Sequence, residues 1–123
     1  MSVRRLMAAF AALAVVVGIG ASSVLASGSQ TQATTVVVKA GVGNALKFSL
    51  SKKTAKAGKV SFSVTNVSSL PHDFWISGKK TPMLGGKGKH ATLTVTLKKG
   101  KYSYKCTVPG HAAAGMKGTF TVT

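Results

Sequence analysis

A short segment near the C-terminus concentrates the side chains that soft metals prefer. CTVPGHAAAGM, residues 106–116, contains Cys106, the only cysteine of the chain, followed by His111 and Met116. Each of these residues, taken alone, is ordinarily a packing or surface residue. The proline and the two glycines between them interrupt regular structure, so the segment is expected to form a tight loop. Such a loop would bring a thiol, an imidazole and a thioether to one point.

This set of donors suits copper. Two histidines and one cysteine, with a weak axial methionine, form the geometry of copper sites that transfer electrons. The second histidine is provided by His72, which follows the turn-like SSLP segment, residues 68–71. His90 lies among lysines at the start of a predicted strand and is expected to be exposed rather than a ligand. The predicted ligands of one mononuclear copper site are His72, Cys106, His111 and Met116.

The elements that must position these residues are short strands. Four segments have apolar residues alternating with Ser, Thr or Lys, which is the period of half-buried strands. With three further segments they predict about seven strands, at residues 34–40, 46–51, 60–65, 72–76, 92–97, 100–107 and 119–123. Glycine-containing turns separate them, which is typical of an antiparallel sandwich or barrel.

Strand parity predicts the direction of individual side chains. In the strand at residues 100–107, Cys106 has the parity of Tyr102 and Tyr104, while the lysines have the other. Because the lysines must face water, the thiol of Cys106 is expected to point inward at the end of this strand. Trp75 is expected to belong to the core of its own strand.

The N-terminus has the order of features typical of a secretory signal peptide. Two arginines precede an uncharged, largely apolar run at residues 6–21, and Val24 and Ala26 provide the small residues before a cut. The run is short for a membrane span of about 20 residues, so cleavage is favoured over a retained anchor. The predicted parts are a signal peptide at 1–26, a short polar spacer at 27–33 and a single domain at 34–123. We therefore expect an exported protein, in the periplasm, outside the cell or on the outer face of the cytoplasmic membrane, with Sec and twin-arginine export both open.

The chain is strongly basic. Its 17 lysines and arginines accompany one acidic residue, Asp73, and the net charge is +16. Both arginines lie in the predicted signal peptide, so the mature chain keeps 15 lysines and a net charge of +14. This excess favours acidic partner proteins or association with anionic surfaces. Nucleic acid is not expected as a partner, because the mature chain has no arginine for bidentate base contacts. With one acidic residue, no carboxylate pair can form, so an enzyme is not expected.

Two longer segments resemble the ligand-bearing segments of the cupredoxins, the small blue copper proteins. They are KYSYKCTVPGHAAAGMKGTFTV, residues 101–122, and NVSSLPHDFWI, residues 66–76. The resemblance extends over residues 34–123 and implies a Greek-key β-sandwich with type 1 copper at one end. It also implies a monomer that carries single electrons between redox partners. The alternative is an extracytoplasmic copper-binding or delivery protein that uses the same ligands.

The resemblance also assigns roles to individual residues. By position, His72, Cys106 and His111 would be the strong equatorial ligands and Met116 the axial one. Asp73 stands where many members carry Asn or Ser, and it is expected to tie the His72 segment to the copper loop by accepting backbone hydrogen bonds. The small residues on both sides of His111 are expected to form an apolar patch around an exposed imidazole, through which the electron would pass.

Overall fold

The computed structural model of the chain describes Gly20 and residues 32–123. The rest of the predicted signal peptide, and residues 27–31 of the predicted spacer, lie outside the described residues. Those boundaries therefore stay predictions. Across the described part of the chain, no helix has the length and hydropathy needed to cross a membrane.

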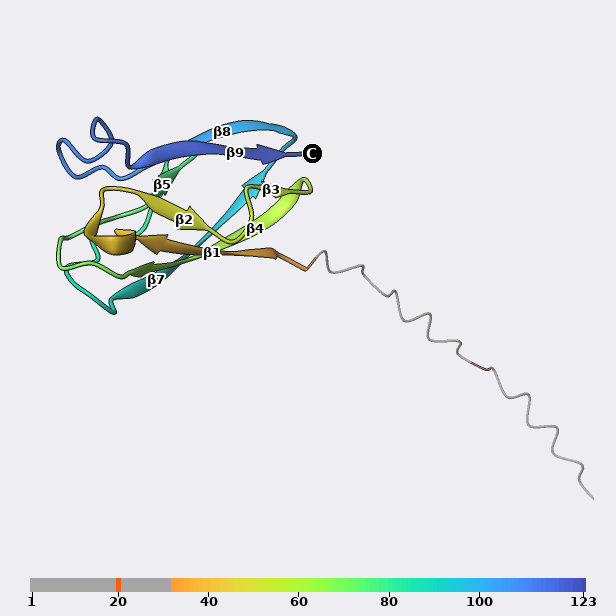
Figure 1. Cartoon of the computed structure of the whole chain (residues 1–123). Helices are drawn as coiled ribbons and strands as arrows, with labels where there is room; N and C mark the ends of the chain where they lie inside the picture. Colours follow the sequence, from red (N-terminus) through yellow and green to blue (C-terminus); the bar gives the residue numbers. More distant parts are fainter. Residues whose placement is uncertain (1–19, 21–31) are drawn as a thin grey trace, which may run out of the picture.

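The described chain consists of strands and one short 3-10 helix. The strands are β1 (Thr34–Ala40), β2 (Phe48–Leu50), β3 (Thr54–Ala55), β4 (Gly58–Asn66), β5 (Trp75–Ile76), β6 (Lys79–Lys80), β7 (His90–Leu97), β8 (Gly100–Lys105) and β9 (Lys117–Val122). The helix, η1 (Val42–Asn44), follows β1. The strands form two sheets packed as a sandwich, one in the order β2-β1-β4-β7 and one in the order β3-β9-β8-β5-β6 (Figure 1).

The prediction of an all-β sandwich is confirmed, with mixed rather than purely antiparallel sheets. β1 and β4 run parallel, from Thr34 opposite Val60 to Ala40 opposite Asn66, and β3 runs parallel to β9. The parallel pairs arise because the chain leaves the first sheet after β2, adds β3 to the edge of the second sheet and returns as β4. The structure has more strands than the seven expected, because β3, β5 and β6 have two residues each and are too short to show a period.

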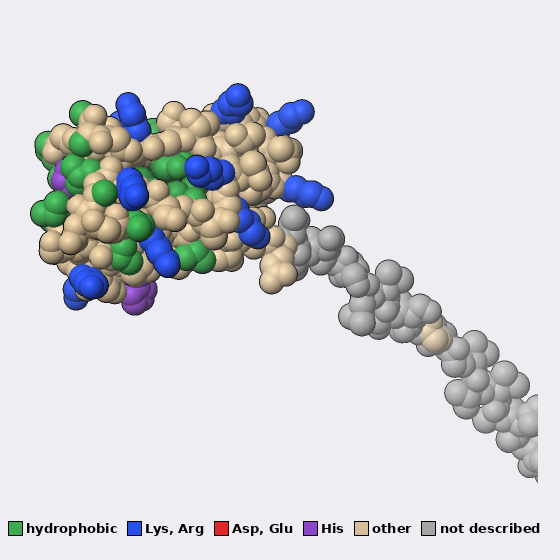
Figure 2. All heavy atoms as spheres, viewed as in Figure 1, with side chains coloured by type: hydrophobic (Ala, Val, Ile, Leu, Met, Phe, Trp, Pro, Cys, Tyr) green, Lys and Arg blue, Asp and Glu red, His purple; other side chains and the backbone are tan. Residues whose placement is uncertain are grey.

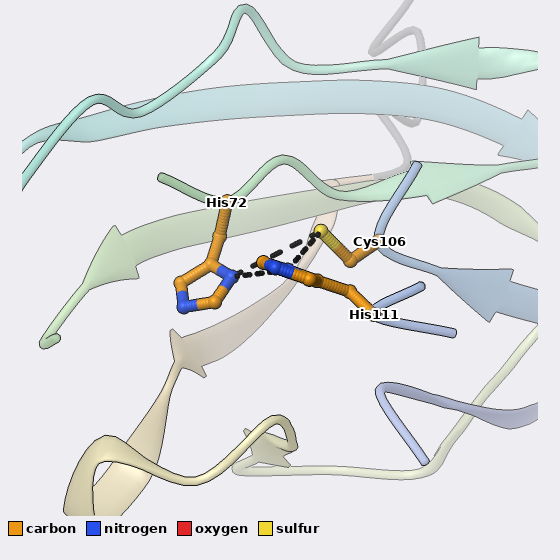
Figure 3. Close-up of side chains that lie close together, drawn as sticks. All are labelled: His72, Cys106 and His111. Atoms are coloured by element: carbon orange, nitrogen blue, oxygen red, sulfur yellow. Dashed lines mark hydrogen bonds between the residues drawn. The ribbon is translucent and has the colours of Figure 1, made fainter. Parts of the chain in front are cut away.

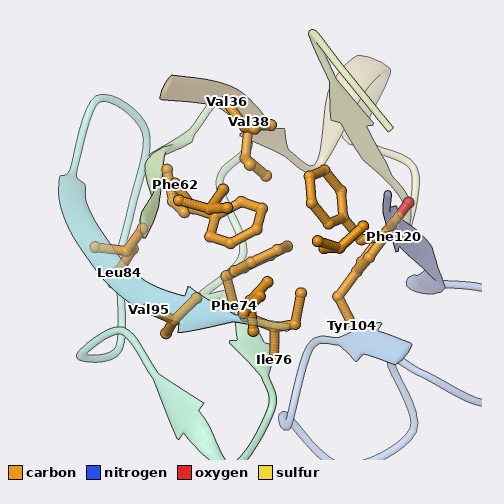
Figure 4. Close-up of a cluster of buried hydrophobic side chains, with 13 residues drawn as sticks. Val36, Val38, Phe62, Phe74, Ile76, Leu84, Val95, Tyr104 and Phe120 are labelled. Atoms are coloured by element: carbon orange, nitrogen blue, oxygen red, sulfur yellow. The ribbon is translucent and has the colours of Figure 1, made fainter. Parts of the chain in front are cut away.

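Aromatic rings form the centre of the core between the sheets (Figure 4). Phe62 packs against Phe74 at a centroid distance of 5.1 Å and against Phe120 at 5.2 Å. Full burial of one phenylalanine side chain stabilises the fold by about 2–3 kcal/mol. Phe74 lies two residues after His72, so the core anchors the segment that carries this histidine.

The prediction that Trp75 belongs to the core is wrong. Phe74 and Ile76, on either side of it, are fully buried, and Trp75 between them is half-exposed on the opposite face. The ammonium of Lys105 lies over its ring, 5.0 Å from the centroid. Alternation along the strand decides which side chains are buried here, and it outweighs the preference of a large aromatic residue for the core.

Four loops gather at one end of the sandwich, which we call the ligand end. They are residues 41–47, 67–71, 84–89 and 106–116. Backbone hydrogen bonds tie two of them to the ends of β1 and β4, from Val67 to Ala40 and from Gly88 to Asn66. β1, β4 and β8 all run toward this end and begin at the opposite one.

Candidate metal centre

The backbone N–H and carbonyl of His72 are both hydrogen-bonded at the ligand end. Its N–H donates to the carbonyl of Leu84 at 3.1 Å, and its carbonyl accepts from the N–H of Leu84 at 2.8 Å. The imidazole is fully buried. An isolated bridge between two loop segments therefore holds the backbone of His72 in place.

The loop after β8 brings the other predicted ligands to the same place. The N–H of Cys106 donates to the carbonyl of Met116 at 3.1 Å, and the N–H of Met116 donates to the carbonyl of His111 at 3.0 Å. Cys106 and Met116 are buried, whereas His111 is half-buried. The predicted inward direction of Cys106 is confirmed. Met116 packs with Cys106 and Ala40 in a small apolar cluster that is separate from the main core.

Three donor atoms point toward one another, as Figure 3 shows for His72, Cys106 and His111. The two Nδ1 atoms lie 3.2 Å apart, and Sγ of Cys106 lies 3.6 Å from Nδ1 of His111 and 3.9 Å from Nδ1 of His72. The point equidistant from these three atoms is about 2.1 Å from each of them. First-row metals bind imidazole nitrogen and thiolate sulfur at about 2.0–2.3 Å. The triangle therefore has the size that one such ion requires.

The comparisons with known proteins agree with this geometry. The family model that describes copper-binding proteins of the plastocyanin/azurin family matches residues 67–123, the part of the chain that contains all four predicted ligands. The structure of reduced rusticyanin superimposes with a TM-score of 0.58 at 25% sequence identity, over 72% of this chain and 78% of that one. Together these findings indicate a cupredoxin.

Other solved structures have the same fold as this cupredoxin. Reduced auracyanin from Roseiflexus castenholzii matches with a TM-score of 0.63 and 24% identity, over 74% of this chain and 98% of that one. Auracyanin A, a blue copper protein from Chloroflexus aurantiacus, matches with a TM-score of 0.60 and 22% identity, over 75% of this chain and 100% of that one. No curated protein matches the chain in sequence. The predictions of the cupredoxin fold and of copper as the cofactor are confirmed.

A buried hydroxyl determines which nitrogen of His72 faces the cupredoxin's metal position. Nε2 of His72 lies 2.8 Å from Oγ of Ser68, and the same Oγ accepts the N–H of Leu70 at 3.2 Å. The one hydroxyl proton has acceptors in the carbonyl of Leu70 and in Oδ1 of Asn66, at 3.3 and 3.1 Å. With its proton donated to one of these two oxygens, Oγ of Ser68 is free to accept a hydrogen bond from Nε2–H of His72. The lone pair on Nδ1 is left facing the metal position.

Asn66 supports this hydroxyl from behind. It is fully buried, and its amide group donates to the carbonyls of Leu70 and Leu84 at 2.7 and 2.8 Å. Its Oδ1 also accepts the backbone N–H of Ser68 at 2.9 Å. Asn66 and Ser68 were not among the residues expected at the site. The available signal was two polar residues shortly before His72, but residue type alone does not show that a polar side chain is buried.

Asp73 joins the two ligand-bearing segments, as predicted. It is buried, and its Oδ1 accepts the backbone N–H of Thr107 at 2.6 Å, while Oδ2 accepts the hydroxyl of the same residue. Asp73 follows His72, and Thr107 follows Cys106. A single carboxylate therefore fixes the separation of two predicted ligands.

Burial shifts the pKa of two of the predicted ligands before a metal binds. Burial lowers the pKa of His72 below its ordinary value of 6.5, the neighbouring His111 lowers it further, and Asp73 opposes the shift. Burial also raises the pKa of the Cys106 thiol above its ordinary value of 9.0. The imidazole of His72 is therefore ready to bind at neutral pH, whereas the thiol must give up its proton to the metal.

His90 does not join this group, as expected. It is exposed at the start of β7, opposite Thr65, and it is not part of the cluster of His72, Cys106 and His111.

Proposed function

We propose that this cupredoxin carries single electrons between redox partner proteins through a mononuclear type 1 copper. The ligands in this proposal are His72, Cys106, His111 and Met116. The observation that carries it is the triangle of two Nδ1 atoms and one Sγ atom, whose size fits one metal ion (Figure 3). Copper bound there would supply the one-electron redox step.

The surroundings of the site favour electron transfer over catalysis. Four protein ligands leave no open position for a substrate, in contrast to a catalytic metal. The only acidic residue of the chain, Asp73, is committed to Thr107 and has no second carboxylate to work with. We therefore propose that the protein is not an enzyme.

The ligands are also held against movement. Fast electron transfer needs a site that changes little between the two oxidation states of the metal. The hydrogen bonds of His72 to Leu84 and Ser68 hold one ligand, and the closed backbone of the loop from Cys106 to Met116 holds the others. Among the described residues, every buried side-chain nitrogen or oxygen has a hydrogen-bond partner. Such a network resists rearrangement because each displaced group would lose a partner.

The surface around His111 offers a route for the electron. Pro109, Gly110, Ala113 and Ala114 are exposed on either side of this half-buried imidazole. Hydrophobic side chains gather at this end of the molecule in Figure 2. Small apolar residues let a partner approach the ring closely, and exposed apolar patches often mark contact sites.

We further propose an exported monomer with acidic redox partners. The support is the predicted signal peptide together with six exposed lysines near the ligand end, Lys47, Lys80, Lys87, Lys89, Lys105 and Lys117. Attraction between these lysines and an acidic partner predicts an association rate that falls as ionic strength rises. A rate that is independent of salt would contradict the acidic partner but not the electron-transfer function.

A redox titration combined with a copper-retention test separates this function from its alternative. The copper-loaded protein is titrated with ascorbate and reoxidised with ferricyanide over many cycles, in the presence of an excess Cu(I) chelator. An electron carrier takes up one electron per copper and keeps its copper throughout. Loss of copper to the chelator on the first reduction would favour the copper-delivery alternative, and uptake of no electron would contradict the proposal.

A further inference from the structure

A cluster of lysines lies at the end of the sandwich opposite the ligand end. It comprises Lys52, Lys53, Lys56, Lys59, Lys98, Lys99 and Lys101, which flank β3, the start of β4 and the turn from β7 to β8. All seven are exposed, and they are nearly half of the 15 lysines of the chain. We call this region the lysine end. Basic side chains project from it in Figure 2, beside the point where the described chain begins.

No acidic residue offsets this charge. The single acidic residue of the chain, Asp73, is buried at the ligand end. The seven charges therefore act together on any surface that approaches the lysine end.

The lysine end is too distant to steer a partner to His111. β4 runs between the two ends with nine residues, so about 26 Å separates them at roughly 3.3 Å per residue. The Debye length at physiological ionic strength is about 8 Å. The field of the lysine end is therefore largely screened at the ligand end, and these lysines need a partner of their own.

The path of the chain indicates what that partner is. β1 begins at the lysine end, with Thr34 opposite Val60, so the preceding residues join the domain there (Figure 1). Before cleavage those residues include the uncharged apolar run at 6–21, so the lysine end is the part of the domain that follows this run along the chain. Cleavage removes the run and leaves the lysine cluster, and clustered lysines bind anionic lipid surfaces by about 1 kcal/mol each.

We propose that the lysine end binds the surface of a membrane rich in anionic phospholipid, with the ligand end facing away from it. The ammonium groups would bind lipid phosphates, which leaves the surface around His111 free for a redox partner. The two ends of the sandwich then have separate tasks, one for holding the protein at a membrane and one for electron transfer.

Two variants with equal charge test this assignment. The lysine-end variant carries Lys52→Gln, Lys56→Gln, Lys98→Gln and Lys99→Gln. The ligand-end control carries Lys47→Gln, Lys80→Gln, Lys87→Gln and Lys89→Gln. All eight side chains are exposed, so neither set removes a buried contact. The full copper-loaded chain is mixed with vesicles of phosphatidylcholine and phosphatidylglycerol at about 7:3, or of phosphatidylcholine alone, and bound protein is measured by flotation.

The ratio of the partition coefficients for the two vesicle types cancels any contribution of the apolar run and isolates the phosphatidylglycerol-dependent part. One lysine near an anionic surface changes binding about five-fold, so four substitutions are expected to weaken the phosphatidylglycerol-dependent part about a hundred-fold or more. The control is expected to lose less than about ten-fold, because its charges face away. Equal losses in the two variants would overturn the proposal, as would binding that does not depend on phosphatidylglycerol. Retained vesicle binding by the lysine-end variant would also overturn it. Failure of the unmodified protein to bind either kind of vesicle would overturn it as well and would leave an acidic protein as the partner.

The orientation has its own readout in Trp75, the only tryptophan of the chain. It pairs with Lys105 at the ligand end of β8, so lipids with brominated acyl chains are expected to leave its fluorescence unquenched in the bound protein. Strong quenching would contradict the proposed orientation. Both variants are expected to keep the copper absorption of the unmodified protein, so failure of the membrane proposal is distinguishable from failure of the electron-transfer proposal.

Discussion

The loop after β1 passes so close to His72 that a single added methyl group should disturb the site. At Gly41, with φ +80°, a Cβ atom would lie 2.5 Å from both Cβ and Oγ of Ser68 and 2.8 Å from Nε2 of His72. At Gly43, in the same loop with φ +66°, a Cβ atom would meet nothing within 4 Å. Gly43→Ala is therefore a matched control for Gly41→Ala.

The two substitutions share one cost and differ in another. Both force alanine into the left-handed region, which costs about 1–2 kcal/mol. Only Gly41→Ala also overpacks the site, and overpacking typically costs about 1–3 kcal/mol. We expect the free energy of unfolding to fall by about 2–5 kcal/mol for Gly41→Ala and by about 1–2 kcal/mol for Gly43→Ala.

Urea unfolding of the metal-free proteins, followed by circular dichroism, measures this difference. In thermal unfolding, a difference of 1 kcal/mol corresponds to about 4–8 °C in Tm for a domain of this size. Because relief of the clash must move His72 or Ser68, the absorption of bound Cu(II) is expected to change in Gly41→Ala and to stay unchanged in Gly43→Ala. Equal destabilisation within about 0.5 kcal/mol would refute the close packing of this loop against the imidazole.

Three further predictions concern the groups that support the ligands. Ser68→Ala leaves Nε2–H of His72 without its acceptor, so copper affinity is expected to fall about 10–100-fold in chelator competition. Ser69→Ala, at an exposed neighbour, should have little effect, and equal affinities in the two variants would speak against this role. Asp73→Ala unpairs the N–H of Thr107 and should destabilise the protein by about 1–3 kcal/mol in urea, whereas Asp73→Asn keeps one acceptor and should cost less; the reverse order would contradict the bridging role. Because burial lowers the pKa of His72, the neutral imidazole is accommodated in the metal-free fold at full stability above pH 6.5. The free energy of unfolding should fall as the pH drops through the lowered pKa, because the buried imidazole must then take up a proton. In His72→Gln, the free energy of unfolding should depend less steeply on pH in this acidic range. An unchanged slope would exclude His72 as the source of the pH dependence.

The features predicted correctly from the sequence depend on short-range pattern. The direction of Cys106 follows from the alternation along its own strand, and the loop from Cys106 to Met116 follows from proline and glycine within eleven residues. The pairing of His72 with this loop is long-range, and it was available because the motif around each ligand is itself distinctive. The resemblance to the cupredoxins therefore predicted this pairing, which neither strand periodicity nor residue propensity could predict.

The features that were missed depend on tertiary contact. Asn66 and Ser68 matter because they are buried beside His72, and Gly41 matters because a distant loop passes over them. None of these contacts corresponds to an alternation or spacing that can be recognised in the sequence. The prediction for Trp75 was wrong because it relied on residue type, which favours the core. Alternation along the strand directs the side chain outward, where it contacts Lys105.

The most direct test of the central claim is the visible spectrum of the protein loaded with Cu(II), compared with that of Cys106→Ser. His90→Gln is the control, because this histidine is exposed and outside the site. A type 1 copper site predicts an intense thiolate-to-copper absorption in the unmodified protein and in the control, bleached by reductant and absent in Cys106→Ser. An absorption that survives the loss of Cys106, or a colourless copper complex of the unmodified protein, would contradict it.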